Sequence, residues 1–72
     1  MEPPEPAWWK PEMHEPWFHI AADGHIASET WTDASADRER WWIGNCFKTR
    51  DQAEQAREII REALRHFRQH PA

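Results

Sequence analysis

An apolar pattern in the last third of the chain limits how everything before it can fold. Seven apolar side chains recur there at intervals of three and four residues: Ala53, Ala56, Ile59, Ile60, Ala63, Leu64 and Phe67. This period predicts one amphipathic helix over residues 49–69 with a single apolar stripe. Thr49 is a favourable N-cap, Gln52 completes a capping-box pattern, and Pro71 ends the helix. The rest of the chain is therefore expected to cover this stripe, with Leu64 in the core.

A β-hairpin is predicted before this helix. Two runs rich in β-forming residues flank the dipeptide Asp23-Gly24, which is a strong hairpin signal. A three-residue loop with Gly24 in the left-handed region pairs Ile20 with Ile26. A two-residue loop would place Ile26 on the opposite face from Phe18 and Ile20. We therefore expect the longer loop, with these three apolar side chains on the face that covers the helix.

The remaining segments complete an α+β prediction. Residues 32–40 are polar and predict a connecting loop with at most one helical turn. The aromatic and aliphatic residues that follow predict a third strand over residues 42–48, bent or bulged at Gly44. The expected fold is a small antiparallel three-stranded sheet (ββ-loop-β) with one C-terminal α-helix packed on one face. It forms a single domain over residues 17–70.

Residues 1–16 hold five of the six prolines and predict an extended arm rich in proline, glutamate and tryptophan. Disordered segments are poor in aromatic residues. We therefore expect at least one of Trp8 and Trp9 to pack back onto the domain.

The distribution of charge indicates a protein partner. The net charge of −4 divides into −6 over residues 1–47, with nine acids against three bases, and +2 over residues 48–72. Nucleic-acid binding requires a concentrated positive face, which an acidic front half does not provide. The single cysteine excludes an internal disulfide, and no apolar run resembles a signal peptide or a membrane span. These features predict a cytoplasmic protein with no membrane contact.

The potentially reactive side chains predict neither an enzyme nor a metal site. His66 and His70 have a metal-ligand spacing on a helix, but the second lies in the fraying last turn. Cys46, beside Phe47, is expected to be a small buried hydrophobic residue rather than a nucleophile. A domain of this size has little room for a dry cleft in which carboxylates could act as acid and base. We therefore expect no catalytic residue, no metal and no cofactor.

The predicted loop and the residues after it form the candidate partner-binding site: Asp33, Asp37, Glu39, Trp41 and Trp42. Consecutive residues of a strand point to opposite faces, so at least one of the two tryptophans should lie either at the surface or under the N-terminal arm. Acidic charge around an aromatic anchor is typical of protein interfaces. Alternatively, the acids only keep the loop soluble.

A second set of candidates joins the arm to the helix: Trp8, Trp9, Arg57, Arg61 and Arg65. The three arginines form a row along one edge of the apolar stripe, three residues after a parallel row of glutamates. Such i,i+3 pairs stabilise a solvated helix. The row is therefore either a salt-bridged surface or an edge that docks acidic groups.

The chain resembles a group of small phage and prophage proteins. The resemblance spans about residues 17–67 and is carried by Trp17-Phe18-His19-Ile20, Asp23-Gly24, Trp31, Asp37, Arg40 and the segment IGNCFKT at residues 43–49. The last segment, which leads into a charged helix, is the most specific. The group has no settled activity, so the resemblance transfers no site residue. It implies a small accessory protein of a mobile element in a bacterial cytoplasm.

Together these features predict a non-enzymatic phage-type binding protein. It would inhibit a host bacterial defence complex, in the manner of an anti-CRISPR protein, through contacts with a host protein or ribonucleoprotein. One alternative is a phage accessory module that binds single-stranded nucleic acid through its tryptophans and arginines. Another is a small dimeric structural protein. The leading hypothesis expects no direct nucleic-acid binding and is compatible with a homodimer.

Overall fold

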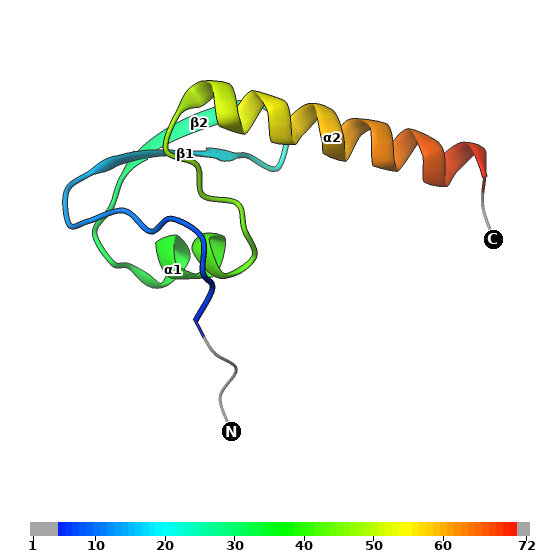
Figure 1. Ribbon diagram of the computed structural model, residues 1–72. Helices are drawn as coiled ribbons and strands as arrows, with labels where there is room; N and C mark the ends of the chain where they lie inside the picture. Colours follow the sequence, from blue (N-terminus) through cyan, green and yellow to red (C-terminus); the bar gives the residue numbers. More distant parts are fainter. Residues whose placement is uncertain (1–4, 71–72) are drawn as a thin grey trace.

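The computed structural model describes residues 5–70, which form two strands and two helices (Figure 1). Their bounds are Pro16–Ile20 for β1, Ile26–Thr30 for β2, Ser35–Trp42 for α1 and Arg50–Gln69 for α2. The two-stranded sheet lies between the helices, with α2 across one face and α1 on the other side. The α+β class is confirmed. The expectation of three strands and a single helix is wrong for the part of the chain that the structure describes.

The hairpin forms in the predicted register. β1 and β2 are antiparallel, with Ile20 opposite Ile26. The Ala21 amide donates a hydrogen bond of 2.9 Å to the His25 carbonyl, which closes a three-residue loop. Gly24 in this loop has a φ of 92°, a conformation that glycine adopts without steric cost. The turn residues therefore predicted the position of the hairpin, and the requirement for one apolar face predicted its register.

The expected strand at residues 42–48 is reduced to one bridge on the free edge of β1. Phe18 and Phe47 exchange two backbone hydrogen bonds, of 2.9 and 2.8 Å. Farther along the edge, the Asn45 side chain takes the place of a strand. Its Oδ1 accepts from the Ile20 amide and its Nδ2 donates to the Ile20 carbonyl, both at 2.8 Å. The third-strand prediction is wrong because a side-chain amide pairs with β1 where a backbone was expected.

Residues 35–42, expected to be mainly loop, form the eight-residue helix α1. Its start is held by Asp37, whose buried carboxylate accepts hydrogen bonds of 3.0 and 3.2 Å from the amide and the hydroxyl of Thr32. Its end is marked by Gly44, which has a φ of 88° and donates to the carbonyl of Trp41. Short helices depend on tertiary packing more than on intrinsic propensity. The loop prediction is wrong because a buried acid and a buried tryptophan stabilise the helix.

A tryptophan cluster on the α1 side of the sheet forms the hydrophobic core. Its buried members are Trp17, Trp31, Trp41 and Cys46, and Trp9 of the arm packs against them. The indole N–H of Trp8 donates a hydrogen bond of 2.8 Å to the Trp41 carbonyl. The Lys10 ammonium lies 4.8 Å from the centroid of the Trp41 ring, within the range of a cation–π contact. The expectation that at least one arm tryptophan packs back is confirmed.

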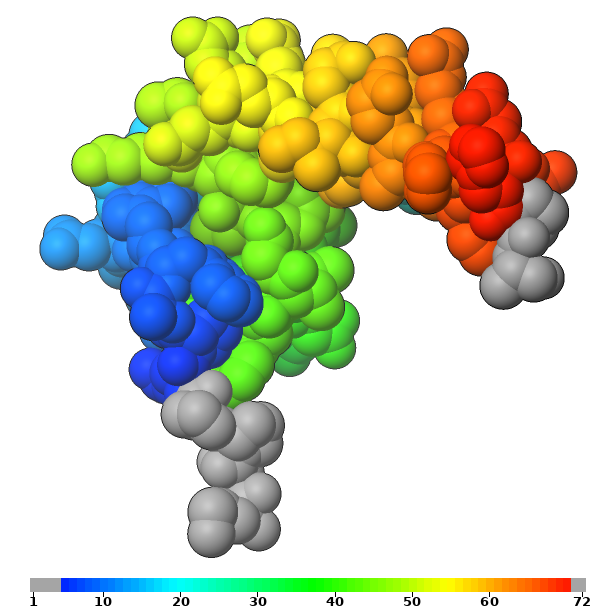
Figure 2. All heavy atoms as spheres, turned by 45° about the vertical axis from the view of Figure 1, so that its right-hand side comes forward, coloured from blue at the N-terminus to red at the C-terminus, as the bar shows by residue number. Residues whose placement is uncertain are grey.

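Helix α2 begins as predicted, but most of its apolar stripe is uncovered. The Thr49 hydroxyl accepts a hydrogen bond of 3.1 Å from the Gln52 amide, which confirms the N-cap. The stripe is buried only at Ala53; the second half of the helix extends beyond the sheet in Figure 1 and projects past the rest of the molecule in Figure 2. The exposed fractions are 71% for Ile59, 49% for Ile60, 60% for Leu64 and 63% for Phe67.

The expectation that this stripe, with Leu64, lies in the core is therefore wrong. The reason is a mismatch in length. A 20-residue helix is about 30 Å long, whereas each five-residue strand is only about 17 Å long. The predicted helix stop at Pro71 and the first four residues of the arm lie outside the described residues.

Candidate protein-binding surfaces

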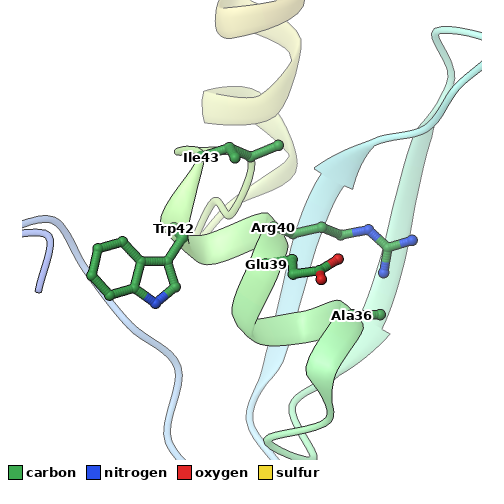
Figure 3. Close-up of a pocket in the computed structure, with 5 residues that line it drawn as sticks. All are labelled: Ala36, Glu39, Arg40, Trp42 and Ile43. Carbon is green, nitrogen blue, oxygen red and sulfur yellow. The ribbon is translucent and has the colours of Figure 1, made fainter. Parts of the chain in front are cut away.

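The outer side of α1 carries a hollow of about 430 Å³, shown in Figure 3. We call it the α1 surface; it is lined by Ala36, Glu39, Arg40, Trp42 and Ile43. Trp42 is 37% exposed and Ile43 is 77% exposed. In Figure 3 the Trp42 indole extends from the last turn of α1 and stands apart from Glu39 and Arg40. Large apolar side chains that gather at a polar-rimmed surface are typical of interaction sites.

The two adjacent tryptophans of α1 have different environments. Successive helical residues are rotated by about 100°, so Trp41 enters the core and is only 4% exposed, while Trp42 stays at the surface. Their rings still meet edge to face, with centroids 5.8 Å apart at 64°. This geometry is favourable for aromatic pairs. The expectation that at least one of the pair is exposed is confirmed, and the exposed indole is supported by its buried neighbour.

The three acids of the candidate site are separated by the fold. Asp37 is buried and accepts hydrogen bonds from Thr32, which ties the first turn of α1 to the segment before it, so its carboxylate is not part of the surface. Asp33 is exposed, has a φ of 59° and lies 3.9 Å from an arginine nitrogen. Glu39 is exposed and lines the same hollow as Trp42. Asp37 and Trp41 therefore leave the candidate site, because both side chains are used inside the fold.

The arginines of the second set make contacts within the chain. Arg61 and Arg65 each lie near the glutamate three residues earlier, at 3.0 and 3.8 Å. Arg57 turns to the hairpin, where its Nη1 donates a hydrogen bond of 3.3 Å to the Gly24 carbonyl. The glutamates beside Arg61 and Arg65 offset the positive charge of these two arginines, which disfavours phosphate binding at this edge of the helix. In the arm, Trp8 is exposed but its N–H is bonded to α1.

A second apolar region lies beneath the second half of α2, residues 60–69, which we call the free half because it extends beyond the sheet (Figure 1). Sequence reasoning missed this region. Two hollows of about 410 and 260 Å³ meet at Ile20 and Ile60. We call the combined feature the α2 groove; its apolar walls are Ile20, Ile43, Phe47, Ile60 and Leu64. The sequence pattern places the stripe in the core, where it would have no binding role. The available signal was the length of the helix relative to the short predicted strands.

Among the side chains that could take part in catalysis or metal binding are Cys46, His66 and His70. Cys46 is buried, and this burial, with a smaller contribution from the charge of Asp37, raises the pKa of its thiol to about 11. The thiol is therefore protonated near neutral pH. The rings of His66 and His70 stack with centroids 4.7 Å apart. Within residues 5–70, no three His, Cys, Asp or Glu side chains gather in a way that could hold a metal ion.

The described surface thus offers two apolar features for binding, the α1 surface and the α2 groove. They share Ile43, which lies between the end of α1 and the start of α2. Across residues 5–70, no helix has the length and apolar character needed to cross a membrane. No protein family, curated protein or solved structure matches this chain.

Proposed function

We propose that this chain is a non-enzymatic, phage-type binding protein that inhibits a host bacterial defence complex in the cytoplasm. It acts through protein–protein contacts made by the α1 surface. The observation that carries the proposal is the exposure of Trp42 beside Ile43 at the end of a helix anchored in the core. Tryptophan is enriched among the few residues that contribute most of the binding energy of interfaces. The resemblance to small phage and prophage proteins supports a target in a bacterial host, without identifying that target.

The charge of the body defines the chemistry of the partner. Residues 5–47 contain eight acids and three bases. At the rim of the α1 surface itself Glu39 and Arg40 contribute one charge of each sign, so the negative charge is that of the surrounding body. Complementary charge accelerates association and selects the partner. The target surface is therefore a basic protein surface with an apolar recess for the Trp42 indole, such as the channel in which a defence complex holds nucleic acid.

Trp42→Ala is expected to abolish inhibition while leaving the protein folded. Truncation of an aromatic hot spot costs about 2 kcal/mol or more, or roughly a 30-fold loss of affinity. Bacteria with an active defence system would express each variant and be challenged with a sensitive phage. Plating efficiency reports inhibition, and titration against the purified defence complex reports affinity.

The matched control is Met13→Ala, which removes another exposed apolar side chain from outside the α1 surface. This variant should protect the phage as well as the wild type does. Equal protection by Trp42→Ala would show that the α1 surface is not the binding site. Failure of the wild type against every defence system tested would argue against the proposed function itself.

The purified protein is expected to show no measurable affinity for single-stranded DNA or RNA near physiological salt. The acidic body repels phosphates, and Arg61 and Arg65 already lie beside glutamates. Fluorescence anisotropy with labelled oligonucleotides at several salt concentrations measures this directly. Micromolar binding that weakens steeply with salt would support the alternative function, a single-stranded nucleic-acid module.

A further inference from the structure

The free half of α2 exposes an apolar stripe, which is unusual for a small protein in isolation. Ile60, Leu64 and Phe67 are exposed on this half, directly after the exposed Ile59, and the helix here projects past the sheet and α1 (Figures 1 and 2). The radius of gyration of the Cα atoms is 13.8 Å, compared with about 11 Å for a compact chain of this length. An amphipathic helix is normally stabilised by burying its apolar stripe against another surface. The chain does not supply that surface within residues 5–70.

We propose that a second copy of this chain covers the stripe. The two overhanging halves of α2 pack antiparallel, and the tip of each helix enters the α2 groove of the other copy. Only the overhang is available for pairing, because the first half of the stripe is buried against the sheet at Ala53. The pairing is therefore centred near Ala63, with Ile60 opposite Phe67 of the second copy. Each copy uses the same patch, which gives a closed twofold dimer.

The opposite net charges of the α2 tip and of the rest of the protein favour this arrangement. Residues 61–70 contain three arginines and one glutamate, whereas residues 5–47 contain eight acids and three bases. Antiparallel pairing brings the basic tip of each copy to the acidic body of the other, and parallel pairing would bring the two basic tips together. Asp23, Arg57 and Arg61 lie at the rim of the α2 groove, and both arginines already have partners within the chain, the Gly24 carbonyl and Glu58. Hydrogen bonds from His25 lower the pKa of the Asp23 carboxyl group, so this group stays negative at neutral pH.

The size of the contact indicates a reversible dimer. A stable interface typically buries about 800 Å² of each partner, and the accessible surface of this protein is 5732 Å². A ten-residue overhang is only about 15 Å long, so the helices and grooves together supply an area at the low end of this class. We therefore expect a micromolar dissociation constant for the dimer.

The first test is sedimentation equilibrium of the full chain from low to high micromolar concentration. The wild type should change from monomer to dimer over this range. Leu64→Glu, which places a charge beside the proposed centre of the helix pairing, should raise the dissociation constant by about 100-fold or more. Met13→Glu adds a charge at another exposed apolar position and should leave the constant unchanged. A monomeric wild type, or a Leu64→Glu variant that dimerises normally, would overturn the proposal.

The second test measures the direction of pairing by disulfide formation. Ala63→Cys places a thiol near the expected twofold axis, where the two Cβ atoms can reach the separation of about 3.5–4.5 Å that a disulfide needs. Gln69→Cys is the control, because residue 69 is equally exposed but lies on the opposite side of the helix from Ile60. The native Cys46 is buried and protonated and should not react.

Under mild oxidation, Ala63→Cys should form covalent dimers much faster than Gln69→Cys or the wild type. Equal rates for the two variants would contradict an antiparallel contact through the stripe. Neither experiment contains a target of inhibition. A negative result here therefore bears only on the dimer, and a negative result in the phage assay bears only on the proposed function.

Discussion

Trp41→Ala is expected to leave the protein largely unfolded at room temperature, whereas Trp42→Ala, one residue later, should cost only about 1–2 kcal/mol, the size of the edge-to-face contact that it removes. Replacing a buried tryptophan by alanine typically costs about 3–5 kcal/mol. The core of a domain this small rarely supplies more than about 3–5 kcal/mol in total. Trp41 is 4% exposed and Trp42 is 37% exposed. The two substitutions remove the same side chain from adjacent positions, so a difference in their stability reports the difference in burial.

The expected loss of stability in Trp41→Ala includes the contacts that hold the N-terminal arm against the core. Its ring packs with Trp17 and Trp31 in the core, and the Lys10 ammonium lies over its face. Urea titrations followed by far-ultraviolet circular dichroism would give the free energy of unfolding of both variants. A Trp41→Ala variant as stable as Trp42→Ala would show that the tryptophan cluster is not the main source of stability.

The elements that were predicted correctly are those specified by neighbouring residues. Asp23-Gly24 determines a hairpin turn through backbone conformation alone, and the register follows from which faces must be apolar. The Thr49 cap is likewise a contact between residues three positions apart. The class of the fold and the start of α2 were therefore accessible from the sequence. The far end of α2 was not, because its exposure depends on how much sheet lies beneath it.

The elements that were missed depend on contacts between distant residues. α1 is stabilised by Trp41 in the core and by a buried acid, and neither produces a helical period over eight residues. Asn45 pairs with Ile20, 25 positions earlier in the chain. The same limitation affected the candidate site. Asp37 looked like a surface acid because its hydrogen bonds to Thr32 cannot be inferred from its charge.

Asn45→Ala is expected to lower the free energy of unfolding by about 2–4 kcal/mol. The substitution removes two hydrogen bonds of 2.8 Å and leaves both the amide and the carbonyl of Ile20 without a partner at a partly buried position. Each such bond contributes about 1 kcal/mol, and an unsatisfied buried group adds a penalty. Thr49→Ala is the comparison, because it removes only one exposed hydrogen bond and should cost about 0.5–2 kcal/mol.

The Asn45→Asp variant tests the same hydrogen bonds through the dependence of its stability on pH. An ionised carboxylate can still accept from the Ile20 amide, but it cannot donate to the Ile20 carbonyl and places a negative charge against that oxygen. The folded state therefore raises the pKa of the introduced carboxyl, because only the protonated form can donate. The variant should be destabilised at neutral pH and regain stability, relative to the wild type, as the pH falls through that raised value. Urea titrations of both proteins at neutral and mildly acidic pH measure the difference. A stability difference that does not change with pH would show that the Asn45 amide does not donate to β1.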